Sequence, residues 1–248
     1  MNLHWLVNKG KGIPVLMYHR IWPNVQDRIT QTPEQLLEQL YFLKRNGYRS
    51  LTLPEYIEIA KGNQQAPEKG VLITFDDGYY NNLTYVYPLL KELQFTATIF
   101  VIGDSLEGNL SLEDPLNRKM SVEELKTLDS KYFQLAMHGF HHENFSTTSL
   151  TDIQSALVKT FDIFQHHQIP LVRALAYPYG ARPEEKRQFD TLKQWMRNHQ
   201  IEAAFRIGNR VSTIPSPDLY EIKRIDIQGN DSIRSYAIKL QKGRLKPF

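Results

Sequence analysis

The sequence contains no cysteine, which excludes a disulfide framework and a thiolate zinc site. No apolar run approaches the ~20 residues that a membrane-spanning helix needs. The net charge is only +3 over 248 residues, and the basic residues form no stripe of the kind that binds nucleic acid. The hydrophobic fraction of 41% and the charged fraction of 23% are typical of a folded globular protein. We therefore expect a globular protein with neither a membrane span nor a nucleic-acid partner.

The two ends of the chain carry weaker signals. Residues 1–14 lack the apolar core and small-residue cleavage site of a signal peptide. This predicts a cytoplasmic protein, or a secreted or periplasmic one if the N-terminus has been trimmed. The basic residues of the tail, 239–246, indicate a solvated end, with contact to an anionic surface as the alternative.

Strand-like and helix-like segments alternate along the whole chain. Residues 71–75, 96–101 and 132–137 are apolar or β-branched runs typical of buried strands. Helical segments separate them, and several open with a capping box, as at Thr32 and Gln35. About eight such units follow one another without repeats or a linker. The pattern predicts an α/β fold with a parallel sheet, either a closed (β/α) barrel or, as the alternative, an open doubly wound sheet.

Polar residues stand where these predicted strands end. Asp76 and Asp77 close one strand, His138 follows another, residues 177–180 follow a third, and His19 follows the first. In a (β/α) barrel, catalytic groups gather at the carboxyl ends of the strands. The four strand ends therefore predict one site.

Asp76 and Asp77 are neighbours, and within a regular strand their side chains would face opposite ways. Because Gly78 frees the backbone at the strand end, both can reach one cleft. Two carboxylates so close are difficult to ionise together without a cation. The alternative is a solvated Asp-Asp-Gly turn.

His138 and His142 are four positions apart, which on a helix or in a tight turn places both on one side, with His141 pointing elsewhere. Taken alone, this stretch is more typical of a surface loop with incidental histidines. Together with the two aspartates it supplies one carboxylate and two imidazoles for a divalent metal, and leaves one carboxylate as a base. Such a set suits metal-assisted hydrolysis.

Three motifs carry a resemblance to a known family. Thr-Phe-Asp-Asp-Gly at 74–78, His-Gly-Phe-His-His at 138–142 and Tyr-Pro-Tyr-Gly at 177–180 resemble, in order and spacing, the motifs of the polysaccharide deacetylases, which share the NodB homology domain of carbohydrate esterase family 4. The resemblance covers about residues 70–180. It implies a distorted (β/α) barrel of 7–8 strands, and we expect residues 1–248 to form one such domain.

The resemblance also implies residue roles. Asp76 corresponds to the catalytic base, and Asp77, His138 and His142 correspond to the metal ligands. The backbone N–H of Tyr179 would help to hold the oxyanion. Three neighbouring residues are assigned to substrate contact: Tyr79, Tyr177 and Pro178. Zinc is the first expectation for the metal, and cobalt, nickel and iron suit the same ligands.

The chain departs from the family pattern at Ala176, where the family usually has an arginine that orients the base. Arg173, Arg182 and Arg224 are the possible substitutes. We favour Arg224, because the end of the predicted strand at 220–227 aims it at the mouth of the barrel.

The family's last motif, an apolar strand that ends in a histidine acid, is absent after residue 180, and His199 reads as a structural residue. Val-Leu-Met-Tyr-His at 15–19 has the right form at the other end of the chain. Since the first and last strands of a barrel are neighbours, a circular shift of the motif order would preserve the pocket. We therefore predict His19 as the general acid, as in the resembling branch that acts on poly-N-acetylglucosamine.

These observations predict a metal-dependent hydrolase that removes N-acetyl groups from an amino-sugar polysaccharide or oligosaccharide. One alternative is a deacylase of a small or lipid-linked sugar, acting on O-acetyl or formyl groups. Another is a metal-containing glycan-binding domain with impaired catalysis. The expected partner is a carbohydrate substrate, and the oligomeric state is left open.

Overall fold

The computed structural model describes residues 12–243. Most of the N-terminal segment that bears on a signal peptide, and the end of the basic tail, lie outside the described residues. Within the described part of the chain, no helix is both long enough and apolar enough to cross a membrane.

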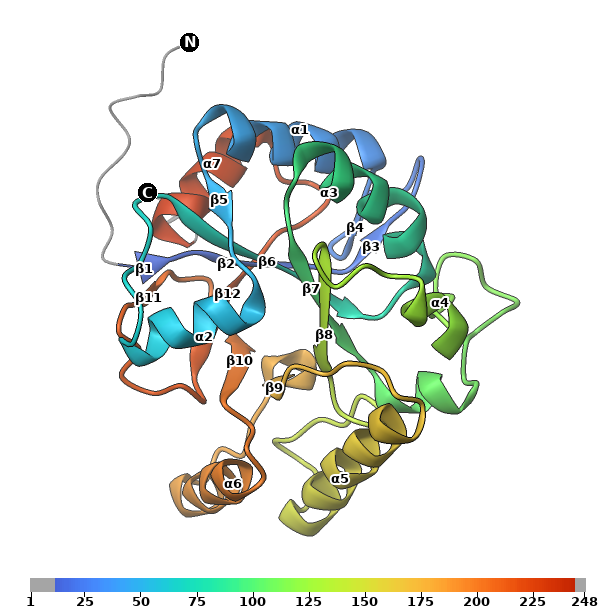
Figure 1. Cartoon of the computed structure of the whole chain (residues 1–248), viewed down its shortest axis with the longest axis vertical. Coiled ribbons are helices and arrows are strands. Elements are labelled where there is room, and N and C mark those ends of the chain that lie inside the picture. The colour runs from blue at the N-terminus through green and yellow to red at the C-terminus, as the bar shows by residue number, and fades with distance from the viewer. Residues whose placement is uncertain (1–11, 244–248) are drawn as a thin grey trace.

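Seven parallel strands close into a barrel, which confirms the predicted α/β barrel (Figure 1). They pair in a ring, with β12 beside β2 and β2 beside β6. The strands of the ring are β2 (Val15–Tyr18), β6 (Gly70–Asp77), β7 (Ala97–Val101), β8 (Phe133–Met137), β9 (Ala174–Ala176), β10 (Ala203–Ile207) and β12 (Ile222–Asp226). An eighth strand, β5 (Arg49–Ser50), pairs with the first two residues of β6, Gly70 and Val71.

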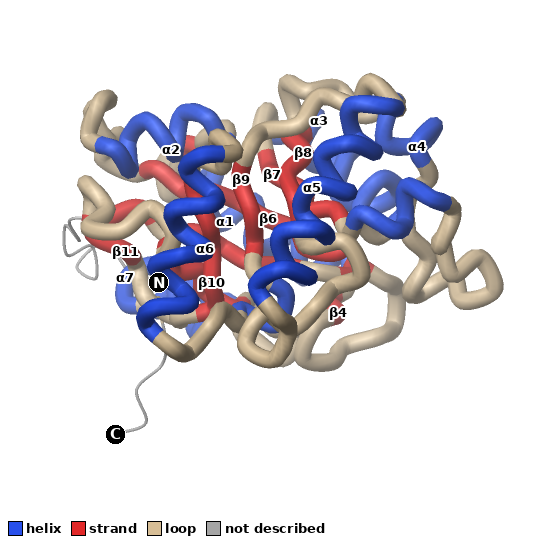
Figure 2. The backbone as a smooth tube through the Cα atoms, turned by 90° about the horizontal axis from the view of Figure 1, so that it is seen from below, coloured by secondary structure: helices blue, strands red, loops and turns tan. Residues whose placement is uncertain are grey.

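Helices surround the barrel (Figures 1 and 2). They are α1 (Pro33–Arg45), α2 (Leu53–Lys61), α3 (Tyr87–Leu93), α4 (Val122–Lys126), α5 (Leu150–His166), α6 (Lys186–Asn198) and α7 (Ile233–Lys242). Figure 2 shows α5 and α6 lying outside the strands. Two short strand pairs lie beside the ring: β1 (Gly12–Ile13) with β11 (Ser212–Thr213), and β3 (Arg20–Ile21) with β4 (Thr30–Gln31).

The segment after β6 is helical from residue 80 to residue 93, as the sequence predicts. Residues 80–81 are α-helical, Asn82–Val86 form a π-helical segment, and α3 continues to Leu93. Pro88 has no backbone N–H to donate to the preceding turn, and such an interruption is tolerated where the helix is locally wider. The helix therefore passes through Pro88, with a π-helical segment just before it.

The alternation of the strands determines which side chains reach the site. Alternate residues point into the barrel, and the inner apolar cluster contains Leu72 of β6, Phe100 of β7 and Ile222 of β12. Asp76 has the same phase as Leu72, and Arg224 has the same phase as Ile222. Both therefore project into the barrel near its carboxyl end.

Candidate active site

Asp76 and Arg224 form a fully buried ion pair. The guanidinium donates to both carboxylate oxygens, at 2.5 and 2.7 Å. Burial alone would raise the pKa of Asp76, but the charge and hydrogen bonds of Arg224, together with the nearby His138 and His19, hold that pKa below its usual range. The two other candidate arginines bond elsewhere: Arg173 donates to the His199 carbonyl, and Arg182 donates to Glu221. Arg224 is thus the one of the three that lies beside Asp76.

A left-handed turn brings the second carboxylate into the same cleft. Asp77 and Gly78 both have a φ of 72°. A non-glycine residue with this φ is strained by about 1–2 kcal/mol, and such strain gathers at functional sites. Because the backbone twists at Asp77, its side chain does not continue the strand alternation. Both carboxylates therefore face His138, whose Nε2 lies 3.7 Å from Oδ2 of Asp76 and 3.4 Å from Oδ1 of Asp77.

His138 is held in the tautomer that leaves Nε2 free. Its Nδ1 lies 2.8 Å from the carbonyl of Ala176, to which it donates. Its Nε2 lies 3.4 Å from Oδ1 of Asp77. Burial lowers the pKa of His138 to about 4, so this imidazole is neutral at pH 7. A neutral imidazole fixed by a carbonyl on its other nitrogen is the usual form of a metal ligand.

His142 reaches the same carboxylate oxygen from a tight turn. Its Nε2 lies 3.5 Å from Oδ1 of Asp77, and its φ is 60°. The carboxylate of Glu143 closes the turn by accepting the backbone N–H groups of Phe140 and His141. Sequence reasoning missed Glu143, whose place directly after the histidines was the available signal. The His141 ring points away, toward Asp104.

These residues fit a divalent metal. One donor atom each from Asp77, His138 and His142 lies within 4.8 Å of the others. Ligand atoms about 2.0–2.1 Å from a tetrahedral zinc are about 3.3–3.4 Å apart, which matches the two carboxylate–imidazole distances of 3.4 and 3.5 Å. Oδ1 of Asp77 is buried and has no hydrogen-bond partner among the described residues. An orphaned carboxylate oxygen that faces two imidazole nitrogens suits a cation.

Lys119 adds a positive charge that the sequence did not reveal. Its Nζ lies 3.8 Å from Oδ2 of Asp77. Burial would raise the pKa of Asp77, but the charge of Lys119 and those of the nearby histidines hold it well below its usual range. Burial in turn lowers the pKa of Lys119 to about 8. Lys119 lies in the connection between β7 and α4, and nothing in the sequence of that connection marks it as part of the site.

His19 joins the site from the first strand. Its Nε2 lies 3.9 Å from Oδ2 of Asp76, and its Nδ1 is buried without a partner in the described part of the chain. The buried amide of Asn82 donates to the His19 carbonyl at 3.0 Å, and the oxygen of Asn81 accepts the Ile21 N–H. Sequence reasoning missed this asparagine pair, which follows the Asp-Asp-Gly motif by only two residues.

The side chain of Tyr177, which was predicted to contact the substrate, lies elsewhere. Its side chain is fully buried in the outer cluster with Phe189, and its hydroxyl donates to the Tyr220 carbonyl at 3.0 Å. Ala176 points into the barrel, so Tyr177, the next residue, points outward. It therefore cannot contact a substrate in the barrel mouth. Pro178 is also buried, close to Gly139.

Tyr179 and Tyr79 differ in how far each is open to a ligand. Tyr179 has a φ of 59°, is 63% exposed, and sets its ring 4.4 Å from that of His142, centroid to centroid. Tyr79 is buried, and Lys119 lies over its ring. Tyr179 is thus open to a ligand, whereas Tyr79 is largely covered.

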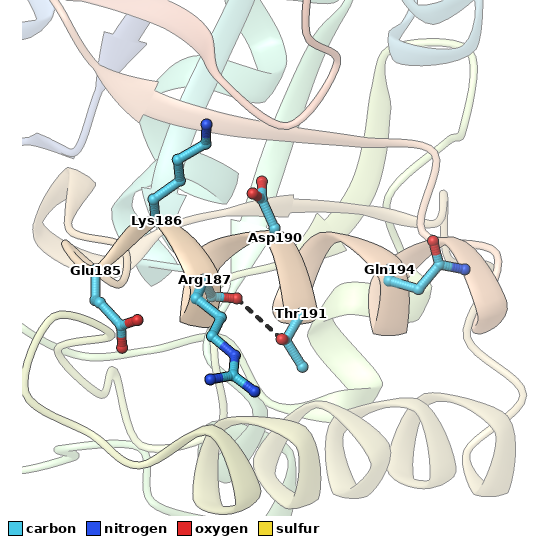
Figure 3. Close-up of a pocket in the computed structure, with 6 residues that line it drawn as sticks. All are labelled: Glu185, Lys186, Arg187, Asp190, Thr191 and Gln194. Atoms are coloured by element: carbon cyan, nitrogen blue, oxygen red, sulfur yellow. Dashed lines mark hydrogen bonds between the residues drawn. The ribbon is translucent and has the colours of Figure 1, made fainter.

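A separate hollow lies on the outer face of α6 (Figure 3). The side chains that line it belong to that helix and to its N-cap: Glu185, Lys186, Arg187, Asp190, Thr191 and Gln194. None of the predicted site residues lines it. The polar centre at the barrel mouth is therefore the stronger candidate.

The chain is similar in sequence to several known proteins. YxkH of Bacillus subtilis is 30% identical over 185 residues, which are 73% of this chain and 62% of that protein. The poly-beta-1,6-N-acetyl-D-glucosamine N-deacetylase of Staphylococcus epidermidis is 26% identical over 82% of this chain and 70% of its own length. The Escherichia coli K12 protein of the same name is 34% identical over 33% of this chain, and the match spans 13% of that protein.

Solved structures share the fold. The Streptococcus pyogenes deacetylase PplD, in complex with acetate, has a TM-score of 0.79 at 21% identity, over 93% of this chain and 98% of its own. IcaB from Ammonifex degensii has a TM-score of 0.77 at 21% identity, over 94% and 98%. A family model described as polysaccharide deacetylase matches residues 63–204, more than half of the sequence. The chain belongs to the polysaccharide deacetylase family.

Proposed function

We propose that this protein is a metal-dependent deacetylase that hydrolyses N-acetyl groups of an amino-sugar glycan. One observation carries the proposal: Oδ1 of Asp77 faces the free nitrogens of His138 and His142. The neighbouring Asp76 is instead hydrogen-bonded through both carboxylate oxygens to Arg224. Three ligands and one unligated carboxylate are the groups that metal-assisted amide hydrolysis requires.

Asp77, His138 and His142 would hold the ion, and its chemistry there is to lower the pKa of a water and polarise the acetyl carbonyl. Asp76 accepts the proton of the attacking water, and Arg224 keeps that carboxylate ionised and oriented. The new C–O bond forms as the carbonyl π bond opens to an oxyanion. The backbone N–H of Tyr179 stabilises this negative charge.

Collapse of the tetrahedral intermediate breaks the C–N bond. His19 donates a proton to the leaving nitrogen, which departs as the amine of the sugar, and acetate remains. His19 is suited to this step because its Nε2 lies 3.9 Å from Asp76, on the same cleft. Proton transfer between the two residues can then restore the resting state.

The geometry supports an enzyme over a binding module. Two sequence departures favoured impaired catalysis: the missing arginine at Ala176 and the missing C-terminal histidine. Arg224 stands at Asp76 in place of the first, and His19 stands near it in place of the second. Each role of the proposed reaction therefore has a candidate residue.

The names of two relatives support poly-N-acetylglucosamine as the first substrate to test. Zinc is the first metal to test, because one carboxylate and two imidazoles form a common catalytic zinc set. Cobalt, nickel and iron remain compatible with the same donors.

Acetate release provides the test. The purified protein is incubated with poly-N-acetylglucosamine or chitooligosaccharide, with a chelator, and with the chelator followed by zinc. We expect acetate and free amine in equal amounts, loss of both with the chelator, and recovery with zinc. The variant Asp77→Asn, which keeps the side-chain size, should stay inactive after zinc is added. Glycan binding without acetate release would reject the enzyme in favour of the binding module.

A further inference from the structure

The two oxygens of Asp77 have different surroundings. Oδ1 faces the imidazoles of His138 and His142 and has no hydrogen-bond partner among residues 12–243. Oδ2 faces the ammonium of Lys119, 3.8 Å away. The same ammonium lies 3.4 Å from the ring centroid of Tyr79. One oxygen of the Asp77 carboxylate therefore faces a lysine, and the other faces two histidines and has no hydrogen-bond partner among those residues.

The backbone fixes Lys119 in this place. Lys119 forms an antiparallel bridge with Tyr79. On either side of the bridge, the Tyr80 N–H donates to the Arg118 carbonyl at 2.8 Å, and the Met120 N–H donates to the Gly78 carbonyl at 2.9 Å. The segment that carries the lysine is thus hydrogen-bonded to the turn that carries Asp77.

Lys119 is also largely withdrawn from water, with its side chain 14% exposed. Removing an ammonium from water is unfavourable unless a counter-charge or an aromatic face compensates. Asp77 and Tyr79 supply these two compensations. A lysine that only improved solubility would need neither a fixed backbone nor a buried charge.

We propose that Lys119 is a positioning residue for Asp77: it occupies Oδ2, so that Asp77 binds the divalent ion through Oδ1 alone. This inference rests on the proposed metal site. Coordination through one oxygen keeps the protein ligands at three and leaves a position open for water or substrate. The positive charge of Lys119 also repels the metal ion bound to the same carboxylate, so Lys119 lowers the affinity of the site for its metal.

The substitution Lys119→Met tests both effects, because methionine keeps an apolar stem over Tyr79 and removes the charge. Loss of a hydrogen-bonding group next to a metal ligand typically weakens metal binding by about 10- to 100-fold. Lys119 is instead a cation that repels the metal, so its removal should act in the opposite direction. We expect Lys119→Met to bind metal more tightly by about that factor. With Oδ2 released, the carboxylate should bind through both oxygens. The visible absorption of bound Co²⁺ should then weaken, as it does when the number of ligands rises above four.

The experiment titrates Co²⁺ and Zn²⁺ into the metal-free full chain, with calorimetry for affinity and absorption for coordination. Lys119→Arg, which keeps the charge, should stay close to the wild type. Lys131→Met is the matched control, because Lys131 also lies over a tyrosine, Tyr132, at 5.0 Å, but on the exposed surface. This control should change neither affinity nor absorption. Lys119→Gln serves as the second charge-removing variant if the methionine variant fails to fold.

The outcomes are distinct. Tighter binding with weaker Co²⁺ absorption in the charge-removing variants alone supports the role of Lys119. Equal or weaker binding in those variants, while the wild type binds metal, overturns it and leaves the proposed metal site standing. Absence of metal binding by the wild type rejects the metal site, and the role of Lys119 falls with it.

Discussion

Replacing Arg224 by methionine should destabilise the protein strongly at neutral pH. The substitution keeps much of the side-chain volume but removes both hydrogen bonds to Asp76, at 2.5 and 2.7 Å. Arg224 is wholly buried, and Asp76 is 2% exposed. Removal of one partner of a buried ion pair costs about 3–5 kcal/mol, because the other charge remains buried without compensation. We expect a loss of this size in the free energy of unfolding at pH 7, measured by urea denaturation.

The loss should depend on pH in a defined direction. In the wild type, Arg224 holds the pKa of Asp76 below its usual value of 3.8. This pair therefore stabilises the protein above about pH 4 and loses its effect as the pH falls further. Without Arg224, burial raises the pKa of Asp76, and the carboxyl group can become neutral in the folded state. The difference between wild type and variant should therefore shrink as the pH falls from 7 toward 4.

Arg206→Met is the control on the neighbouring strand β10. Arg206 bonds to Glu221 at 2.8 Å, but its side chain is 32% exposed. Partly exposed ion pairs contribute about 0–1 kcal/mol, so this variant should lose little stability. If Arg224→Met lost no more than Arg206→Met, or if its loss were the same at pH 5 and pH 7, the account of Asp76 and Arg224 as a buried charged pair would be refuted.

Three further predictions concern the histidines and the base. Asp76→Asn should lower kcat for acetate release by about 10²–10⁴-fold while bound metal, measured by elemental analysis, stays unchanged; loss of the metal would show that Asp76 is a ligand. His19→Ala should lower turnover by a similar factor with metal content intact, and unchanged turnover would reject His19 as the acid. Burial lowers the pKa of His138 from 6.5 to about 4. Between these two pH values the imidazole is protonated in the unfolded chain but neutral in the folded chain. The metal-free protein should therefore lose up to about 3 kcal/mol of stability between pH 6.5 and pH 4, and His138→Gln should lack this dependence. Urea denaturation across that range measures it, and equal slopes for the two proteins would contradict the assignment.

The fold could be predicted because buried parallel strands have a strong sequence signature. The apolar run that β6 contains is bounded by a glycine and by the Asp-Asp-Gly motif, and every residue of β6 is buried. The strand ends then indicated which polar residues would meet. The same alternation could have excluded Tyr177, since a residue that follows an inward-facing Ala176 must face outward.

Other features of the site depend on contacts that no local pattern specifies. The choice among three arginines required the register that places β12 beside β2 and β2 beside β6. The meeting of the two carboxylates required a left-handed φ at Asp77, a conformation that few non-glycine residues adopt. Lys119 is 42 residues from Asp77 in the chain, and its place follows from the hydrogen bonds of a loop. The strand end and Gly78 favoured Arg224 and a shared cleft, but the contacts themselves are tertiary, and no local sequence signal indicated Lys119.

The most direct test of the metal centre is anomalous diffraction at the zinc absorption edge from crystals grown with zinc. The proposed site predicts one strong peak within about 2.0–2.2 Å of Oδ1 of Asp77 and of the Nε2 atoms of His138 and His142. It also predicts that both oxygens of Asp76 stay outside this distance and remain bonded to Arg224. A peak coordinated by Asp76, or imidazoles that remain beyond coordinating distance of the zinc, would contradict the division of the two aspartates into one ligand and one base.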